Sequence, residues 1–91
     1  MNKNKLAIES LSMDLLRVAL GFNRGSNKMA KKFLQEALKR RSEIQDSTVK
    51  HYFAKILDKL PAKLLNNDYE QVAEDALMYS VICKNYARKF A

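Results

Sequence analysis

The sequence predicts an all-α protein, a compact four-helix bundle that forms a single domain over residues 1–91. Leu, Ala and Lys, which all favour helices, are abundant, whereas the chain has only two Gly and one Pro for turns. The balance of apolar residues (47%) and charged residues (30%) is typical of a folded domain and not of a disordered chain. In addition, four stretches repeat apolar residues at helical spacing.

The first predicted helix, residues 4–22, is the most apolar part of the chain. One stripe along it consists of Ile8, Leu11, Leu15, Val18 and Phe22. A second stripe consists of Leu6, Met13, Leu16 and Leu20. The narrow polar seam between them consists of Ser10, Asp14, Arg17 and Gly21. A helix that is apolar on nearly every side has to be covered on several sides, so we expect the rest of the chain to pack against this one.

The second predicted helix, about 27–43, follows a turn that contains Gly25 and Ser26. Gly25 can adopt the left-handed conformation that ends a helix, and Ser26 can cap the next helix. The apolar positions of this helix are Ala30, Phe33, Leu34, Ala37, Leu38 and Ile44. Its opposite face carries Lys28, Lys31, Lys32, Gln35 and Lys39, with Arg40 and Arg41 at the flanks. We therefore expect an amphipathic surface helix with a basic outer face.

The third predicted helix begins near Asp46 or Ser47, either of which can cap it, and has one regular apolar stripe. The stripe consists of Val49, Phe53, Ile56, Leu57, Leu60 and Leu64. Pro61 lacks the N–H of a helical hydrogen bond, and its ring clashes with the preceding turn. We therefore expect this helix to be kinked at 59–61, or to stop there with Pro61 opening a short separate turn over 61–65.

The fourth predicted helix, about 68–89, has acidic residues near its start and basic residues near its end, which complement the helix dipole. One stripe along it consists of Val72, Ala76, Tyr79, Cys83, Tyr86 and Phe90. Four further apolar residues point elsewhere, so the middle of this helix is also apolar on every side. We expect the first and fourth helices to be the buried pair, with the second and third outside them.

Residues that carry chemistry are too sparse and scattered to predict an enzyme. The single histidine, His51, shares a solvent-facing surface with Lys55 and Asp58, and the single cysteine, Cys83, lies in an apolar run. The two glycines stand apart, without the pattern of a phosphate-binding loop. We therefore predict no catalytic site, metal site, cofactor or small-molecule substrate. No apolar run approaches the roughly 18 residues of a membrane span, so we predict a cytoplasmic protein without a membrane partner.

Apolar residues outside the main stripes predict a protein interface. Two outer helices give too little cover for two helices that are apolar on every side, and the uncovered part would mark an interaction surface. The expected interface residues are Leu6, Met13, Leu16, Leu20, Leu77, Met78, Val81 and Ile82. We therefore predict a non-enzymatic interaction or regulatory module that forms a homodimer or binds a partner helix. The alternative is a monomer in which both stripes of the first helix lie in one core.

The net charge of +7 favours an acidic partner and supports nucleic-acid binding as a second hypothesis. The expected contacts are Lys28, Lys31, Lys32, Lys39, Arg40, Lys50 and His51, from the basic face of the second helix and the N-terminal end of the third. These side chains would follow phosphates without reading sequence. The alternative is that the lysine-rich face is simply solvated.

The stretch 44–52, Ile-Gln-Asp-Ser-Thr-Val-Lys-His-Tyr, is similar to the turn and the start of the recognition helix in some helix-turn-helix repressors. This resemblance implies that Ser47, Thr48, Lys50 and His51 would contact DNA in the major groove. It covers about ten residues. Upstream, the chain departs from the family pattern, which has a small apolar residue and a Gly where this sequence has Lys39 and Glu43.

Overall fold

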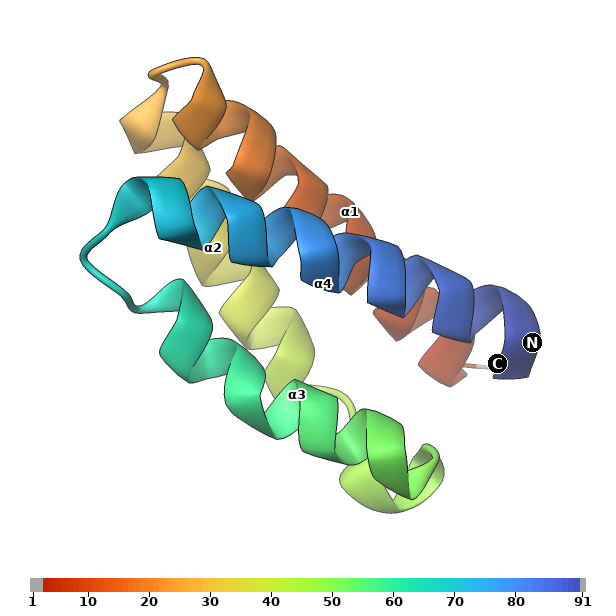
Figure 1. Ribbon diagram of the computed structural model, residues 1–91. Helices are drawn as coiled ribbons and strands as arrows, with labels where there is room; N and C mark the ends of the chain where they lie inside the picture. Colours follow the sequence, from red (N-terminus) through yellow and green to blue (C-terminus); the bar gives the residue numbers. More distant parts are fainter. Residues whose placement is uncertain (1–2, 91) are drawn as a thin grey trace.

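Four α-helices and one short 3₁₀ helix account for nearly all of residues 3–90, the part of the chain that the computed structural model describes (Figure 1). In chain order they are α1 (Lys3–Asn23), α2 (Asn27–Ser42), η1 (Asp46–Thr48), α3 (His51–Leu64) and α4 (Tyr69–Phe90). Residues 3–90 contain no strand, so the prediction of an all-α four-helix bundle is confirmed. Residues 1, 2 and 91 of the expected domain lie outside the described residues.

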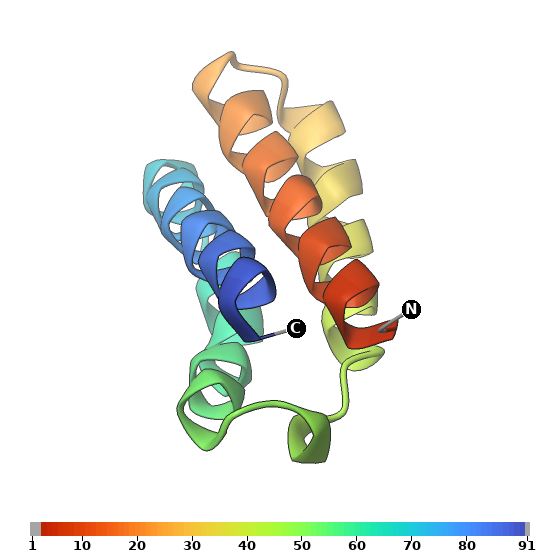
Figure 2. The same ribbon diagram turned by 90° about the vertical axis from the view of Figure 1, so that its right-hand side faces the viewer.

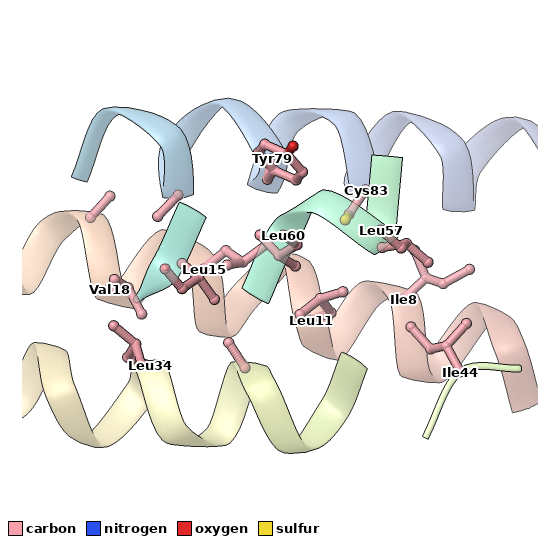
Figure 3. Packing of buried hydrophobic residues seen from close by; sticks show 14 of the residues in the cluster. Ile8, Leu11, Leu15, Val18, Leu34, Ile44, Leu57, Leu60, Tyr79 and Cys83 are labelled. Atoms are coloured by element: carbon pink, nitrogen blue, oxygen red, sulfur yellow. The ribbon is translucent and has the colours of Figure 1, made fainter. Parts of the chain in front are cut away.

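α1 is the central helix of the bundle. It lies between α2 and α4 and packs more extensively against these two helices than any other pair of helices packs together (Figures 2 and 3). Its first apolar stripe is completely buried at Ile8, Leu11, Leu15 and Val18. Leu34 of α2 and Leu60 of α3 point toward this stripe and belong to the same buried cluster. α2 and α4 therefore pack against the first helix as expected, whereas α3 packs mainly against α4.

α1 runs antiparallel to both of its main neighbours. The turn to α2 contains Gly25, whose φ of +76° is the expected left-handed conformation. Near this turn, a Cβ added to Gly21 would lie only 2.8 Å from the Cβ of Ala30, so the lack of a side chain allows α1 and α2 to approach closely. On the α4 side, the rings of Phe22 and Tyr69 stack with 4.7 Å between their centroids, which places the end of α1 beside the start of α4.

The helix ends agree with the sequence predictions only in part. Ser26 precedes α2 as expected, but its side chain makes no capping hydrogen bond. The predicted cap of α3 at Asp46 or Ser47 is wrong, because both residues lie in η1 and α3 begins at His51. Asp68 caps α4, since its Oδ1 accepts hydrogen bonds from two backbone N–H groups of the first turn at 3.1 and 3.3 Å.

α3 continues through Pro61 to Leu64 as one helix, so the expected stop at Pro61 is wrong, while a kink there stays a prediction. Because Pro61 has no N–H, the carbonyl oxygen of Leu57 lacks its helical donor. The Nε of Arg41, near the end of α2, donates to that oxygen at 3.1 Å. A side chain from a neighbouring helix thus replaces the hydrogen bond that proline cannot make.

The guanidinium of Arg41 also makes three further contacts. Its Nη1 donates to the carbonyl oxygen of Ile44 at 3.1 Å, and its Nη2 lies 2.9 Å from Asp46 Oδ1 and 3.1 Å from Asp58 Oδ1. The side chain is only 13% exposed, so these charge-assisted bonds are partly shielded from water. Arg41 therefore holds η1 and α3 against the C-terminal end of α2.

We expect Arg41→Lys to lower the free energy of unfolding by about 2 kcal/mol, because an ammonium group cannot reproduce this fork of donors. Urea denaturation followed by circular dichroism measures the change, and Arg24→Lys is the matched control at an exposed position. Pro61→Ala supplies a helical N–H to the Leu57 carbonyl and should therefore reduce the cost of Arg41→Lys. An equal cost in the natural and Pro61→Ala backgrounds would contradict the role of the Arg41 Nε.

Candidate protein-interaction surface

The residues predicted to form a protein interface are mostly exposed in the described chain. Leu6, Met13, Leu20, Leu77, Met78 and Val81 are between 38% and 50% exposed. The other two, Leu16 and Ile82, are half-buried. The core of the chain therefore does not enclose the second stripe of α1, and the oligomeric state stays a prediction.

Four of these residues border an apolar groove between α1 and α4. Met13 and Leu16 line it from α1, and Leu77 and Val81 line it from α4. The groove has a volume of about 290 Å³, and its lining also includes Glu9, Ser12, Ser80 and Lys84. We call this set of eight residues the α1/α4 groove.

Two buried serines connect the helices beneath the α1/α4 groove. The Oγ of Ser12 donates to the carbonyl oxygen of Ser80 at 2.8 Å, and the Oγ of Ser80 donates to the carbonyl oxygen of Ser12 at 2.8 Å. The two hydroxyl oxygens are 3.3 Å apart. Because the distance between packed helices depends on the side chains at their contact, this small, reciprocally bonded pair allows α1 and α4 to approach closely.

The other predicted interface residues divide into two groups. Leu6 and Leu20 lie on the same stripe of α1 as Met13, one heptad before and after it, so they extend the apolar surface beyond both ends of the groove. Met78 lies about 100° around α4 from its neighbour Leu77 and is not part of the groove. Ile82 lines a different hollow. The structure therefore brings six of the eight predicted residues to one face.

That different hollow contains residues that the sequence analysis did not single out for function. It has a volume of about 470 Å³, and its lining consists of Tyr52, Ile82, Asn85, Tyr86, Lys89 and Phe90. We call this set the aromatic hollow. Phe90 was expected on the buried stripe of α4, but its side chain is 42% exposed. The sequence does show that Tyr86, Lys89 and Phe90 lie within about one helical turn of each other. It does not show that Tyr52 of α3 lies beside them, because that contact depends on the fold.

The seven basic residues predicted to contact nucleic acid do not form one patch. Five of them lie on α2, whereas Lys50 and His51 lie at the start of α3, where Lys50 contacts the C-terminal part of α4 and His51 lines a hollow with Asp46 and Asp58. On α2, the Nζ of Lys31 lies 5.1 Å from the centroid of the Tyr69 ring. Arg40 is half-buried and pairs with Glu43 at 3.2 Å. The exposed stripe that is left on α2 consists of Lys28, Lys32 and Lys39.

The local structure differs from the one that the helix-turn-helix resemblance implies. Ser47 and Thr48 lie in η1, and α3 begins only at His51. The backbone N–H of Lys50 donates to the hydroxyl of Tyr86 at 2.8 Å, so the N-terminal end of α3 is held against α4. Ser47 and Thr48 are therefore not in the first turn of a recognition helix.

Two buried titratable groups of α4, Cys83 and Tyr79, have raised pKa values. Cys83 is completely buried, and this burial raises the pKa of its thiol to about 12, so the thiol is protonated and unreactive at neutral pH. Burial is also the main cause that raises the pKa of Tyr79. Within residues 3–90, no group of three or more His, Cys, Asp and Glu side chains is placed to hold a metal ion.

Asp14 is a buried carboxylate at the contact between α1 and α2. It is 7% exposed; its Oδ1 lies 3.6 Å from Nη1 of Arg17, and its Oδ2 is buried without a hydrogen-bond partner. Desolvation raises the pKa of Asp14 above its ordinary value of 3.8, and Glu36 adds to the rise, whereas Arg40 and Arg17 oppose it. The Nε of Arg40 is likewise buried without a partner. The ionised carboxylate therefore opposes folding at neutral pH.

No helix of residues 3–90 combines the length and the apolar character that crossing a membrane requires. Comparison of the chain with protein-family models, with curated proteins and with solved structures finds no match.

We expect Ser12→Ala to lower the free energy of unfolding by about 1 kcal/mol, because it removes one buried hydrogen bond between α1 and α4. Ser12→Leu should cost about 3 kcal/mol, since the larger side chain forces the two helices apart. Thermal and urea denaturation measure both effects, with Ser47→Ala as a control at an exposed serine. A Ser12→Leu variant as stable as the natural chain would show that α1 and α4 are not closely packed at this point.

We expect Asp14→Asn to gain stability relative to the natural chain as the pH rises from about 3.8 through the folded pKa of Asp14. Because the folded pKa is the higher one, the folded chain keeps its proton in this range while the unfolded chain loses it, so this group's contribution to stability falls with rising pH. Urea denaturation at a series of pH values measures the difference, with exposed Glu74→Gln as the control. If the free energy of unfolding changed with pH in the same way for Asp14→Asn and for the natural chain, the proposed desolvation of Asp14 would be contradicted.

Proposed function

We propose that this protein is a small, non-enzymatic interaction module that forms a homodimer through the apolar face of α1 and α4. The observation that supports the proposal is the set of half-exposed apolar side chains on two neighbouring helices, on both sides of the α1/α4 groove. Monomeric proteins rarely leave large contiguous apolar patches in water, and such patches mark interaction sites. A second copy of the same chain can cover the face, because a two-fold axis brings identical patches together.

The charged residues of the α1/α4 groove favour a second copy over an unrelated apolar helix. Glu9 lies about one turn from Ser12 on α1, and Lys84 lies one turn from Ser80 on α4. Because α1 and α4 are antiparallel and Ser12 meets Ser80, Glu9 and Lys84 lie at the same level of the helix pair. A two-fold axis parallel to the helices would place α1 of one copy over α4 of the other, with each Glu9 facing the partner's Lys84.

A cytoplasmic location is part of the proposal. The chain has a single cysteine, so it cannot form a disulfide within itself, and the side chain of Cys83 is completely buried. A protein that does not depend on disulfides is suited to a reducing compartment. We propose that the dimer has a regulatory or scaffolding role and that the protein catalyses no reaction.

We expect the natural chain to be a dimer in sedimentation-velocity experiments, and Met13→Glu or Leu77→Glu to raise the dissociation constant about 30-fold or more. The reason is that each change places a charge in the apolar contact on both copies. Both side chains are nearly half exposed, so the variants should keep the circular-dichroism spectrum of the natural chain. Leu65→Glu is the matched control, because Leu65 is 64% exposed and outside the α1/α4 groove.

Charge reversal tests the orientation of the two copies. Glu9→Lys and Lys84→Glu should each weaken the dimer, and the double variant should restore much of the lost affinity because the pairs between copies are re-formed. A natural chain that stays monomeric at roughly 100 µM would overturn the proposed dimer. A dimer that is unaffected by Met13→Glu and Leu77→Glu would show that the contact lies elsewhere.

A further inference from the structure

The aromatic hollow lies where the start of α3 meets the last turns of α4. Tyr52 lines it from α3, and the other five lining residues belong to α4. Along α4, Ile82 and Lys89 lie about 80–100° around the helix from Val81 of the α1/α4 groove, and Asn85 lies between these two lines. The two surfaces therefore use different sides of α4, and a ligand of the hollow leaves the proposed dimer contact free.

The aromatic side chains of the hollow are held in place from behind and open to water in front. The ring of Tyr86 stacks on the buried ring of Phe53 with 3.9 Å between centroids and an interplanar angle of 5°, and its hydroxyl accepts a hydrogen bond from the Lys50 N–H. Tyr52 and Phe90 contact Tyr86 at centroid distances of 6.1 and 5.2 Å. The side chain of Tyr52 is 51% exposed and that of Phe90 is 42% exposed. The two rings are therefore already ordered, and they lose little conformational entropy when a ligand binds to their exposed surfaces.

The charge around these rings is positive. The Nζ atoms of Lys50 and Lys89 each lie 5.3 Å from the centroid of the Phe90 ring. Neither ammonium group takes part in an ion pair that the structure describes within residues 3–90. The two segments that meet here, 47–57 and 84–90, contain Lys, Arg and His but no Asp or Glu. The hollow is therefore suited to a ligand that is both aromatic and anionic.

We propose that the aromatic hollow binds single-stranded nucleic acid. A base stacks on the exposed ring surface of Tyr52, and the adjoining phosphates lie near Lys50 and Lys89 beside Phe90. Single strands offer unstacked bases to aromatic side chains, and stacking combined with a basic surface is the usual mode of binding without sequence preference. Duplex DNA keeps its bases stacked inside the helix and would use only the lysines, and an acidic peptide would leave the rings without a stacking partner.

The test uses the full chain and a fluorescently labelled oligothymidylate of about 12 nucleotides, with fluorescence anisotropy at low salt as the readout. An oligomer of the same length without bases carries the same phosphates and is the matched ligand control. We expect the natural chain to bind the oligothymidylate roughly 5- to 150-fold more tightly than the control, the range that stacking of one base provides. Tyr52→Phe should retain this preference, whereas Tyr52→Ala should lose it.

Charge-matched variants test the position of the phosphates. Lys89→Gln should weaken binding and make the plot of log affinity against log salt concentration less steep, by the amount that corresponds to about one phosphate contact. Lys28→Gln removes the same charge from α2 and should have a smaller effect. Circular dichroism confirms that each variant is folded. Equal affinity for the two oligomers, equal effects of Lys89→Gln and Lys28→Gln, or no binding at about 50 mM salt would each overturn the proposal. Tighter binding of an acidic peptide with the same sensitivity to Tyr52→Ala would overturn it as well and assign the hollow to a protein partner.

Discussion

The close contact between α1 and α4 at Ser12 and Ser80 is the constraint on which the rest of the structure depends. Two hydroxyl groups bond to the carbonyl oxygens of the opposite helix, so the polar side chains are satisfied although they are buried. Larger residues at these positions would separate the helices, and the apolar stripe of α1 could not be buried against α4 and α2 together. Because α1 is covered by α2 on one side and by α4 on the other, its second stripe is left facing water.

Helical periodicity was sufficient to predict the main features of the fold and the presence of exposed apolar side chains on α1 and α4. The spacing of Ile8, Leu11, Leu15 and Val18 predicted the buried stripe, and the excess of apolar residues on α1 and α4 predicted which side chains would be exposed. These features depend on residues three, four or seven apart in one helix, so they are present in the sequence itself. Met78 is exposed as an interface residue would be, but it lies outside the α1/α4 groove, because the sequence does not show which flank of a helix meets its neighbour.

The features that the sequence did not predict depend on contacts between distant segments. The continuation of α3 through Pro61 requires a donor from Arg41, twenty residues earlier, and no local rule connects the two. The late start of α3 at His51 accompanies a hydrogen bond from the Lys50 N–H to Tyr86 on another helix. The aromatic hollow likewise combines Tyr52 with residues of α4. Each of these depends on tertiary structure, which overrides the local preferences of capping residues and of proline.

The central position of α1 has a consequence for the synthesis of the chain. The serines that connect α1 to α4 are 68 residues apart in the sequence, whereas α1 and α2 are joined by a short turn. Contacts between neighbouring segments form early, and contacts that close a long loop form late. On the ribosome, the hairpin of α1 and α2 is therefore complete well before residues 69–90 emerge. Until then the most apolar helix is covered on one side only, and exposed apolar surface of this kind favours aggregation.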